Sequence, residues 1–259
     1  MQAYQIVQKA RDIKRVSTSE IIANLCDYFL ECHGDRLAGD DAAIIGGVGR
    51  IGEQAVTIIG IQKGKTLKEN LKRNFGSAGP TGYRKAQRLM KQADKFNRPV
   101  ITLINTAGAF CSPESEEQGI GEAIASSLLT MSQLRVPTLA IILGEGGSGG
   151  AIALALADRV WMLENSVYSI LSPEGFASIL FKDAKLAAKA ADMMKLTAQE
   201  LLDLSVIDRI IKEEEGGQPL SHEVLLANLT HAIKRELGRL LSMKTEDRLA
   251  ARQAKFRQF

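Results

Sequence analysis

The sequence predicts an α/β fold in which parallel strands are joined by helical crossovers. Short apolar runs at residues 99–104, 137–143 and 159–163 are typical of buried strands, and the first two are each followed by a loop and a helix-like stretch. Repeated strand, loop and helix units indicate parallel pairing. The 259 residues, of which 45% are hydrophobic and 24% charged, are enough for a sizeable core.

The first predicted element is a helix that begins after Ser17. Ser17 and Glu20 have the spacing of a capping box, and apolar residues follow at helical spacing as far as Phe29. Gly34 is expected to end this helix. The β-rich runs within residues 42–60, on either side of a Gly-Glu turn, then predict a hairpin, in which Gly46 and Gly47 are bulge or close-packing positions.

Residues 63–95 are rich in positive charge, with a glycine-rich loop at residues 74–82. Arg84 and Arg88 are four residues apart and are expected to share one helical face. Two interpretations remain open, a solvated helix face and an anion site at the start of that helix. The basic residues are Lys63, Lys65, Lys68, Lys72, Arg73, Arg84, Lys85, Arg88 and Lys91.

The central part of the chain carries the repeated units. In order, we expect a strand at 99–104, a loop at 105–113, a helix at 116–134, a strand at 137–143, the loop GEGGSGGA, a helix reaching residue 157, and strands at 159–163 and 167–171. After residue 182 the pattern is mostly helical, apart from a strand-like run at 205–211.

The C-terminal part is expected to follow a linker at residues 213–219. Leucines and isoleucines between Leu225 and Leu240 have helical spacing, and a polar tail is expected from Arg248 to Phe259. These patterns divide the chain into an N-terminal helical segment (1–40), a core (41–215) and C-terminal helices (216–259).

Composition excludes several classes of function. The 33 basic and 30 acidic residues give a net charge of only +3, which does not favour nucleic acid as a partner. Cys26, Cys32 and Cys111 lie in no metal-ligand spacing and are expected to be reduced thiols, so no metal site is predicted. No uninterrupted apolar stretch approaches membrane-spanning length, and we expect a cytoplasmic protein that does not contact membranes.

The loop GEGGSGGA at residues 144–151 matches two motifs at once. Gly144, Gly146 and Gly149 fit a dinucleotide-binding pattern, and Glu164 lies twenty residues after Gly144. A dinucleotide-binding fold, however, needs further alternating strands and helices. Here Asn165 leads directly toward another strand, which argues against that interpretation.

The second motif places Ser148 as a nucleophile between glycines. A serine nucleophile needs a base, and histidine is the usual one. The chain has His33, His222 and His231, all outside the strand-loop-helix units. A Ser-Lys arrangement is not excluded by composition.

A third interpretation uses only the main chain. Gly149 and Gly150 are predicted to open a helix, where N–H groups have no intrahelical partner and the helix dipole is positive. Without Cβ atoms, these residues allow a substrate oxygen to approach closely. The loop is therefore predicted to stabilise a developing negative charge, as in an oxyanion hole.

Several longer stretches of the chain are distinctive when taken together. They are GDRLAGDDAAIIGG (34–47), IGIQKGKTLKENLKRNFG (59–76), GYRKAQRLMKQADKF (82–96), INTAGAF (104–110), GEGGSGGAIALALADRVWMLENSVYSILSPEG (144–175) and IDRII (207–211). In this order and spacing they resemble a known family, the carboxyltransferase α subunits of bacterial acetyl-coenzyme A carboxylase. The resemblance implies a crotonase-like fold, in which repeated β-β-α units wind into a spiral with helices added at both ends.

The resemblance also implies a function and partners. The family transfers a carboxyl group from carboxybiotin, held by the biotin carboxyl carrier protein, to acetyl-coenzyme A, and the malonyl-coenzyme A produced serves fatty acid biosynthesis. Biotin carboxylase charges the biotin using ATP. The α subunit joins a zinc-bearing β subunit in an α2β2 heterotetramer.

By the same resemblance, Gly149 and Gly150 are the catalytic donors to the biotin ureido oxygen. Gly108, Ala109, Gly146 and Gly147 are expected to line the site. Lys63 and Arg84, from the basic segment, are expected to attract coenzyme A phosphates or an acidic carrier protein. The family often has Asp-Thr-Pro-Gly-Ala-Tyr-Pro-Gly where residues 105–112 differ, so the path of this loop is a separate question.

Two other functions remain open at this point. One is a serine hydrolase of the related Clp-protease-like fold that uses Ser148. The other is a catalytically silent scaffold subunit.

Overall fold

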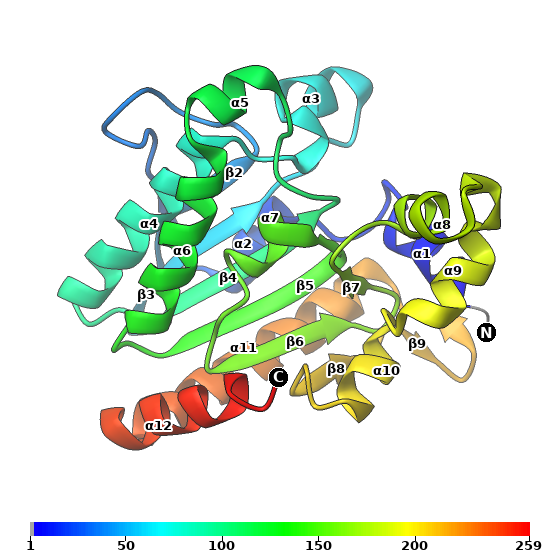
Figure 1. Ribbon diagram of the computed structural model, residues 1–259. Coiled ribbons are helices and arrows are strands. Elements are labelled where there is room, and N and C mark those ends of the chain that lie inside the picture. Colours follow the sequence, from blue (N-terminus) through cyan, green and yellow to red (C-terminus); the bar gives the residue numbers. More distant parts are fainter. Residues whose placement is uncertain (1–2) are drawn as a thin grey trace.

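The computed structural model describes residues 3–259, and an eight-stranded sheet organises it (Figure 1). Strands β1, β2 and β3 pair antiparallel, whereas β3, β4, β5, β6 and β8 follow one another in parallel, and β7 pairs with the end of β5. The predicted α/β fold with parallel strands is therefore confirmed. The strands are β1 (Tyr28–Glu31), β2 (Ile44–Ile51), β3 (Gln54–Ile61), β4 (Val100–Thr106), β5 (Thr138–Gly147), β6 (Arg159–Leu163), β7 (Val167–Ser169) and β8 (Arg209–Ile211).

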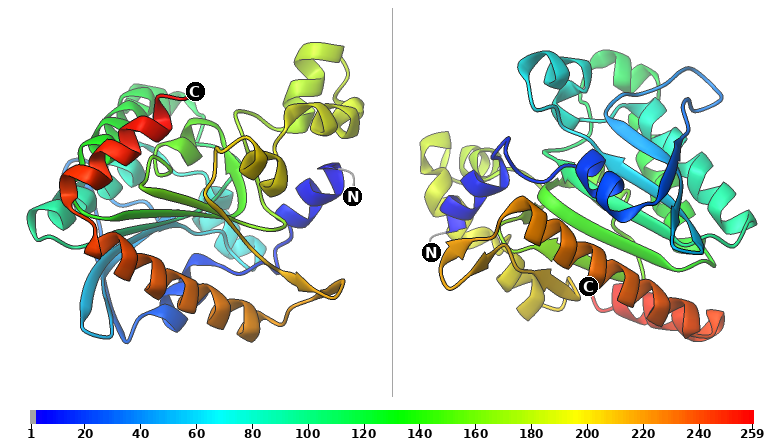
Figure 2. Two further views of the ribbon diagram at one scale, coloured as in Figure 1. Left: turned by 90° about the horizontal axis from the view of Figure 1, so that it is seen from below. Right: turned by 180° about the vertical axis from the view of Figure 1, so that it is seen from behind.

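Helices cover both faces of this sheet (Figure 2). On one face α4, α6 and α7 enclose a core that includes Tyr83 and Leu89. On the other, α2 and α11 pack around Ile21, Trp161 and Ile233. The helices are α1 (Ala3–Ala10), α2 (Thr18–Leu25), α3 (Leu67–Lys72), α4 (Pro80–Lys95), α5 (Pro113–Glu117), α6 (Ile120–Gln133), α7 (Ser148–Ile152), α8 (Pro173–Phe181), α9 (Ala187–Met194), α10 (Ala198–Asp203), α11 (His222–Ser242) and α12 (Thr245–Phe256), with 3-10 turns η1 (Asn74–Gly76) and η2 (Ala184–Leu186).

The predicted hairpin is confirmed as β2 and β3, joined at Gly52, whose φ is 59°. Gly46 and Gly47 are close-packing positions. A Cβ atom at Gly46 would lie 2.4 Å from Leu89 Cδ1, and one at Gly47 would lie 2.1 Å from the Leu30 carbonyl oxygen. Glycine is needed here because α4 and β1 pack directly against the backbone of β2.

The capping box of α2 is confirmed, because Ser17 accepts from the Glu20 N–H and the Glu20 side chain accepts from the Ser17 N–H. The helix does not continue to Gly34 as predicted. It ends at Leu25, and residues 28–31 form β1, which pairs with the outer edge of β2. The N-terminal segment is thus not purely helical. Its residues 28–31 satisfy the backbone hydrogen bonds at the edge of β2, although the apolar residues up to Phe29 have helical spacing.

Three other segments differ from the sequence prediction. The helix expected at 116–134 is split into α5 and α6 at Gly119, whose φ of 80° is left-handed. The helix after the glycine loop ends at Ile152, and the Leu154 carbonyl beyond it accepts from Thr102 Oγ1 at 2.6 Å. The expected linker is a hairpin of β9 (Glu214–Glu215) and β10 (Gln218–Pro219), whose turn places two glycines at positive φ.

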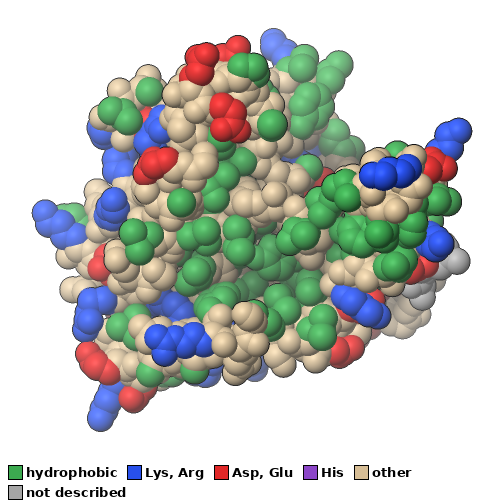
Figure 3. Space-filling model, viewed as in Figure 1, with side chains coloured by type: hydrophobic (Ala, Val, Ile, Leu, Met, Phe, Trp, Pro, Cys, Tyr) green, Lys and Arg blue, Asp and Glu red, His purple; other side chains and the backbone are tan. Residues whose placement is uncertain are grey.

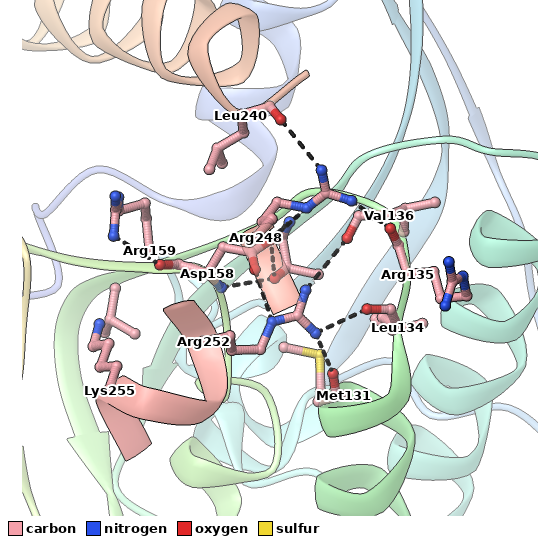
Figure 4. A network of polar contacts seen from close by, with 12 residues as sticks. Met131, Leu134, Arg135, Val136, Asp158, Arg159, Leu240, Arg248, Arg252 and Lys255 are labelled. Carbon is pink, nitrogen blue, oxygen red and sulfur yellow. Dashed lines mark hydrogen bonds and ion pairs between the residues drawn. The ribbon is translucent and has the colours of Figure 1, made fainter. Parts of the chain in front are cut away.

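The polar tail is the largest difference, because it forms α12 and inserts two arginines into the core (Figure 4). Arg248 and Arg252 are 4% and 3% exposed, and both face Asp158, which is also 4% exposed. Arg252 Nε lies 2.8 Å from one carboxylate oxygen, and the Thr138 N–H donates to the other at 2.7 Å. This cluster ties the end of the chain to the start of β5 and β6.

Candidate functional site

The glycine loop forms the turn between β5 and α7. The strand ends at Gly147, which is also the N-cap of α7 and supplies no side-chain cap. The first N–H groups of a helix have no intrahelical acceptor. Gly149 and Gly150 lie in the first turn of this helix, as the sequence predicts, and their N–H groups, like that of Ser148, have no intrahelical acceptor.

The loop after β4 crosses directly over these glycines. A Cβ atom at Gly147 would lie 2.0 Å from the Ala107 carbonyl oxygen, and one at Gly150 would lie 2.5 Å from Ala109 N. Both glycines are required by this close backbone approach. The structure thus brings the predicted pairs Gly108–Ala109 and Gly149–Gly150 together.

Gly146 and Gly147 are themselves part of β5. They pair with Tyr168 and Ser169 of β7, and a Cβ atom at Gly146 would lie 3.1 Å from Tyr168 Cδ2. Their backbones are therefore held by the sheet. They fix the direction in which α7 starts.

The loop at residues 105–112 has a well-defined path although it departs from the family pattern. Thr106 Oγ1 donates to the Gly108 carbonyl at 2.7 Å and accepts from the Gly108 N–H at 3.1 Å. The Phe110 N–H donates to the Ala78 carbonyl at 2.8 Å. These hydrogen bonds hold Ala109 against Gly150.

An apolar cleft of about 390 Å³ opens beside Ser148 and Gly149. Figure 3 shows hydrophobic side chains gathered around a hollow on this face of the molecule. Ile170, at the rim, is 78% exposed. The other lining residues are Ile152, Tyr168, Ser169, Leu201 and Val206. A ligand here meets main-chain donors at one end and apolar side chains along the walls.

Ser148 has the setting of a turn residue. It is exposed, and its φ of 52° is left-handed. In the described part of the chain, no histidine lines the cleft next to it. His33 contacts Asp40 at 3.1 Å, and His222 and His231 lie on α11. The arrangement does not supply a histidine base to Ser148.

Lys63 follows β3 and lines a second cavity, of about 350 Å³, next to the segment that joins α1 and α2. Its Nζ is 2.7 Å from Glu145 Oε2, and Arg11 Nε is 2.8 Å from Glu145 Oε1. Burial alone would raise the pKa of Glu145, but the two cations outweigh it and the pKa is lowered. Sequence reasoning missed Glu145 and Arg11, although an acidic residue inside a glycine loop was a visible signal.

Arg84 contacts a different part of the chain from Lys63. Its Nε is 3.0 Å from Asp35 Oδ2, and its Nη1 donates to the Gln118 carbonyl at 3.0 Å. Arg88 Nε donates to the Gly34 carbonyl at 3.0 Å, so the predicted shared face of Arg84 and Arg88 is confirmed. This face of α4 is not a solvated surface, because it holds the loop before β2.

Asp35 is the centre of that loop. Burial alone would raise its pKa, but the N–H groups of Gly39, Leu37 and Ala38, together with Arg84, hold the pKa of this carboxylate well below its usual range. Its side chain is fully buried, with 0% exposed. The ionised form is therefore built into the folded state.

Replacing Asp35 with asparagine is expected to lower the free energy of unfolding near neutral pH by about 1–3 kcal/mol, because buried donors lose a charged acceptor. The folded pKa lies below the unfolded value of about 3.9, so this stabilisation is present above that pH and is lost as the pH falls further. Urea unfolding at about pH 7 and about pH 3 should show the difference between wild type and Asp35→Asn shrinking at the lower pH. A difference that stays constant with pH would contradict this account.

Residues 3–259 contain no group of three or more His, Cys, Asp or Glu side chains placed to hold a metal ion. None of their helices is both long and apolar enough to cross a membrane. Cys26, Cys32 and Cys111 are free thiols, as predicted.

Comparison with known proteins gives the family. A family model described as "Acetyl co-enzyme A carboxylase carboxyltransferase-like" matches residues 1–259. The chain belongs to this family. The acetyl-coenzyme A carboxylase carboxyl transferase subunit alpha of Streptococcus pneumoniae (strain Hungary19A-6) is 54% identical over 259 residues, which is all of both chains. The corresponding subunit of strain ATCC 700669 / Spain 23F-1 is also 54% identical over the same length.

Solved structures share the fold of this carboxyltransferase-family chain at low sequence identity. Transcarboxylase 12S, solved with methylmalonyl-coenzyme A, has a TM-score of 0.73 and 19% identity, over 91% of this chain and 45% of that one. The beta subunit of P. aeruginosa geranyl-CoA carboxylase has a TM-score of 0.66 and 20% identity, over 93% and 43%. A Pseudomonas malonate decarboxylase hetero-tetramer in complex with coenzyme A has a TM-score of 0.65 and 18% identity, over 83% and 86%. The predicted crotonase-like fold is confirmed.

Proposed function

We propose that this chain is the α subunit of the acetyl-coenzyme A carboxylase carboxyltransferase. In this role it helps to move a carboxyl group from carboxybiotin to acetyl-coenzyme A, and the product is malonyl-coenzyme A for fatty acid biosynthesis. The family and the full-length relatives support the reaction. The observation that carries the assignment of the site is the convergence of Gly149, Gly150 and the Gly108–Ala109 peptide next to an apolar cleft.

The donor set fits a biotin ureido oxygen. When bound, biotin supplies the carboxyl group, and its ureido oxygen gains negative charge as that group leaves. Gly149 and Gly150 present N–H groups that are fixed before the reaction, so they stabilise this charge without reorganisation. A ligand seated against the apolar walls of the cleft would displace water, which strengthens these hydrogen bonds. A site made of neutral main-chain donors suits an oxygen that becomes anionic.

The remaining predicted site residues have supporting roles in this proposal. Ala109 adds a further N–H group beside Gly150, and Gly146 and Gly147 anchor the turn through the sheet. Lys63 and Arg84 are both engaged in ion pairs. Attraction of coenzyme A phosphates or a carrier protein by these two residues stays a prediction, and Lys63 is the better placed because it lines a cavity.

The proposal includes partners. A zinc-bearing β subunit would complete an α2β2 heterotetramer, and the biotin carboxyl carrier protein would deliver biotin that biotin carboxylase has charged with ATP. The test is co-purification with a candidate β subunit, followed by assay of malonyl-coenzyme A formation with and without this chain. Full activity of the other components alone would contradict the proposal.

Ser148→Ala separates this proposal from a serine hydrolase. Since the transferase uses main-chain donors, the variant is expected to keep its carboxyl-transfer activity to within about tenfold, whereas loss of a true nucleophile costs on the order of 10⁴-fold or more. The measurement is the rate of malonyl-coenzyme A formation by the reconstituted complex. Near-total loss in a folded variant would favour the hydrolase interpretation.

A further inference from the structure

One buried polar group near the candidate site has no partner. Tyr83 lies in the first turns of α4 and is 0% exposed. No group within residues 3–259 forms a hydrogen bond with its Oη atom. A buried hydroxyl without a partner costs free energy, and such groups are uncommon in folded proteins. The position of Tyr83 therefore needs an explanation.

The hydroxyl points at the backbone that carries the proposed donors. A Cβ atom built on Gly150 would lie 2.7 Å from Tyr83 Oη, 2.5 Å from Ala109 N and 2.8 Å from the Gly108 carbonyl carbon. The Tyr83 hydroxyl of α4, the Gly108 carbonyl and Ala109 N–H of the loop at residues 105–112, and Gly150 of α7 therefore lie close together. Tyr83 lies on the inner side of this group, away from solvent.

The hydroxyl stays protonated in this environment. Burial, with the Asp41 carboxylate nearby, raises the pKa of Tyr83 above its usual range. A neutral phenol both donates and accepts a hydrogen bond. The peptide group next to it offers an acceptor, the Gly108 carbonyl, which takes one hydrogen bond from Thr106 Oγ1 and has a second lone pair.

The Gly108–Ala109 peptide is held on one side only. Thr106 Oγ1 contacts both polar atoms of Gly108. Within the described residues, no acceptor takes the Ala109 N–H. In a planar trans peptide the carbonyl and the N–H point in opposite directions, so a second hydrogen bond on this group would fix where the Ala109 N–H points.

We propose that Tyr83 is a positioning residue for the carboxyl-transfer site, and that its hydroxyl donates a hydrogen bond to the Gly108 carbonyl once partner and substrate are bound, which leaves the Ala109 N–H free to face the substrate oxygen. The bond sets the direction of the Ala109 N–H relative to those of Gly149 and Gly150. The free chain keeps the hydroxyl unpaired, which lowers its stability. This inference rests on the proposed function.

The test is Tyr83→Phe, which removes one oxygen and keeps the ring. In the reconstituted complex we expect kcat to fall by about tenfold or more, because small displacements of a catalytic group have effects of this size. The KM for acetyl-coenzyme A should stay unchanged. The free variant should be no less stable than wild type, with a Tm up to about 2–4 °C higher, because an unpaired buried hydroxyl has been removed.

Amide hydrogen exchange gives a readout that does not depend on turnover. In the substrate-bound complex, residues 107–110 should exchange faster in Tyr83→Phe than in wild type, whereas the free chains should match. Tyr28→Phe is the control, because Tyr28 is 61% exposed on the edge strand β1 and its hydroxyl removal should change neither quantity.

The outcomes separate this inference from the proposed function. If the wild-type complex forms no malonyl-coenzyme A, the proposed function fails. If wild type is active and Tyr83→Phe has the same kcat, the positioning role is overturned. A marked fall in the Tm of the free variant would overturn it too, because the hydroxyl would then already be paired in the free chain.

Discussion

Replacing Asp158 with alanine is expected to lower the free energy of unfolding by about 3–5 kcal/mol, because two buried arginines lose their common counter-charge. Arg252 Nε is 2.8 Å and Arg248 Nε is 3.5 Å from the Asp158 carboxylate. The Thr138 N–H loses its acceptor as well. Urea unfolding of the isolated chain measures the change.

The matched control is Glu246→Ala. Glu246 forms an ion pair with Arg135 on the surface, where the two side chains are 77% and 61% exposed. Since exposed pairs contribute at most about 1 kcal/mol, this variant should remain close to wild type. Equal effects of the two substitutions would show that α12 does not depend on the Asp158 cluster for its position.

This cluster marks a limit of prediction from the sequence. The repeated units around β4, β5 and β6 were predictable because apolar runs of strand length alternate with loops and helices. The last twelve residues were not, since Arg248 and Arg252 look like solvated residues in a polar stretch. Their burial depends on Asp158, almost a hundred residues earlier, and on the carbonyls of Met131 and Leu134. No local pattern contains such a pairing.

In the basic segment, too, the partner of a charged side chain could not be predicted from the sequence. Arg84 was predicted to attract anions, and its nearest carboxylate is Asp35, in a loop with no periodic pattern. The glycine loop was predictable, because several glycines between a strand and a helix start require close backbone approach. The backbone that approaches these glycines belongs to the loop at residues 105–112. This contact follows from the parallel pairing of β4 and β5 and is not contained in either segment alone.

Gly150→Val is expected to have the largest effect on activity. The valine Cβ atom would lie 2.5 Å from Ala109 N and 2.8 Å from the Gly108 carbonyl carbon. These are backbone atoms, which cannot move away as the end of a flexible side chain can. Displacing the loop separates Ala109 from the other N–H donors, so carboxyl transfer should fall by about 10²–10³-fold or more. The measurement is malonyl-coenzyme A formation by the complex, after circular dichroism and partner co-purification confirm assembly.

Two further variants make this result interpretable. Gly238→Val places the same side chain on α11, where a Cβ atom would have no neighbour within 4 Å, and it should leave transfer unchanged. Gly149→Ala would bring a methyl group 3.3 Å from Ile124 Cδ1, the end of a side chain that can shift, so this variant should fold even if Gly150→Val does not. Its transfer rate should still fall, because the methyl group stands beside the N–H that binds the oxygen. If Gly150→Val and Gly149→Ala both assembled and transferred as well as Gly238→Val, the main-chain donors would have no catalytic role, and the chain would act as a silent scaffold for its partner.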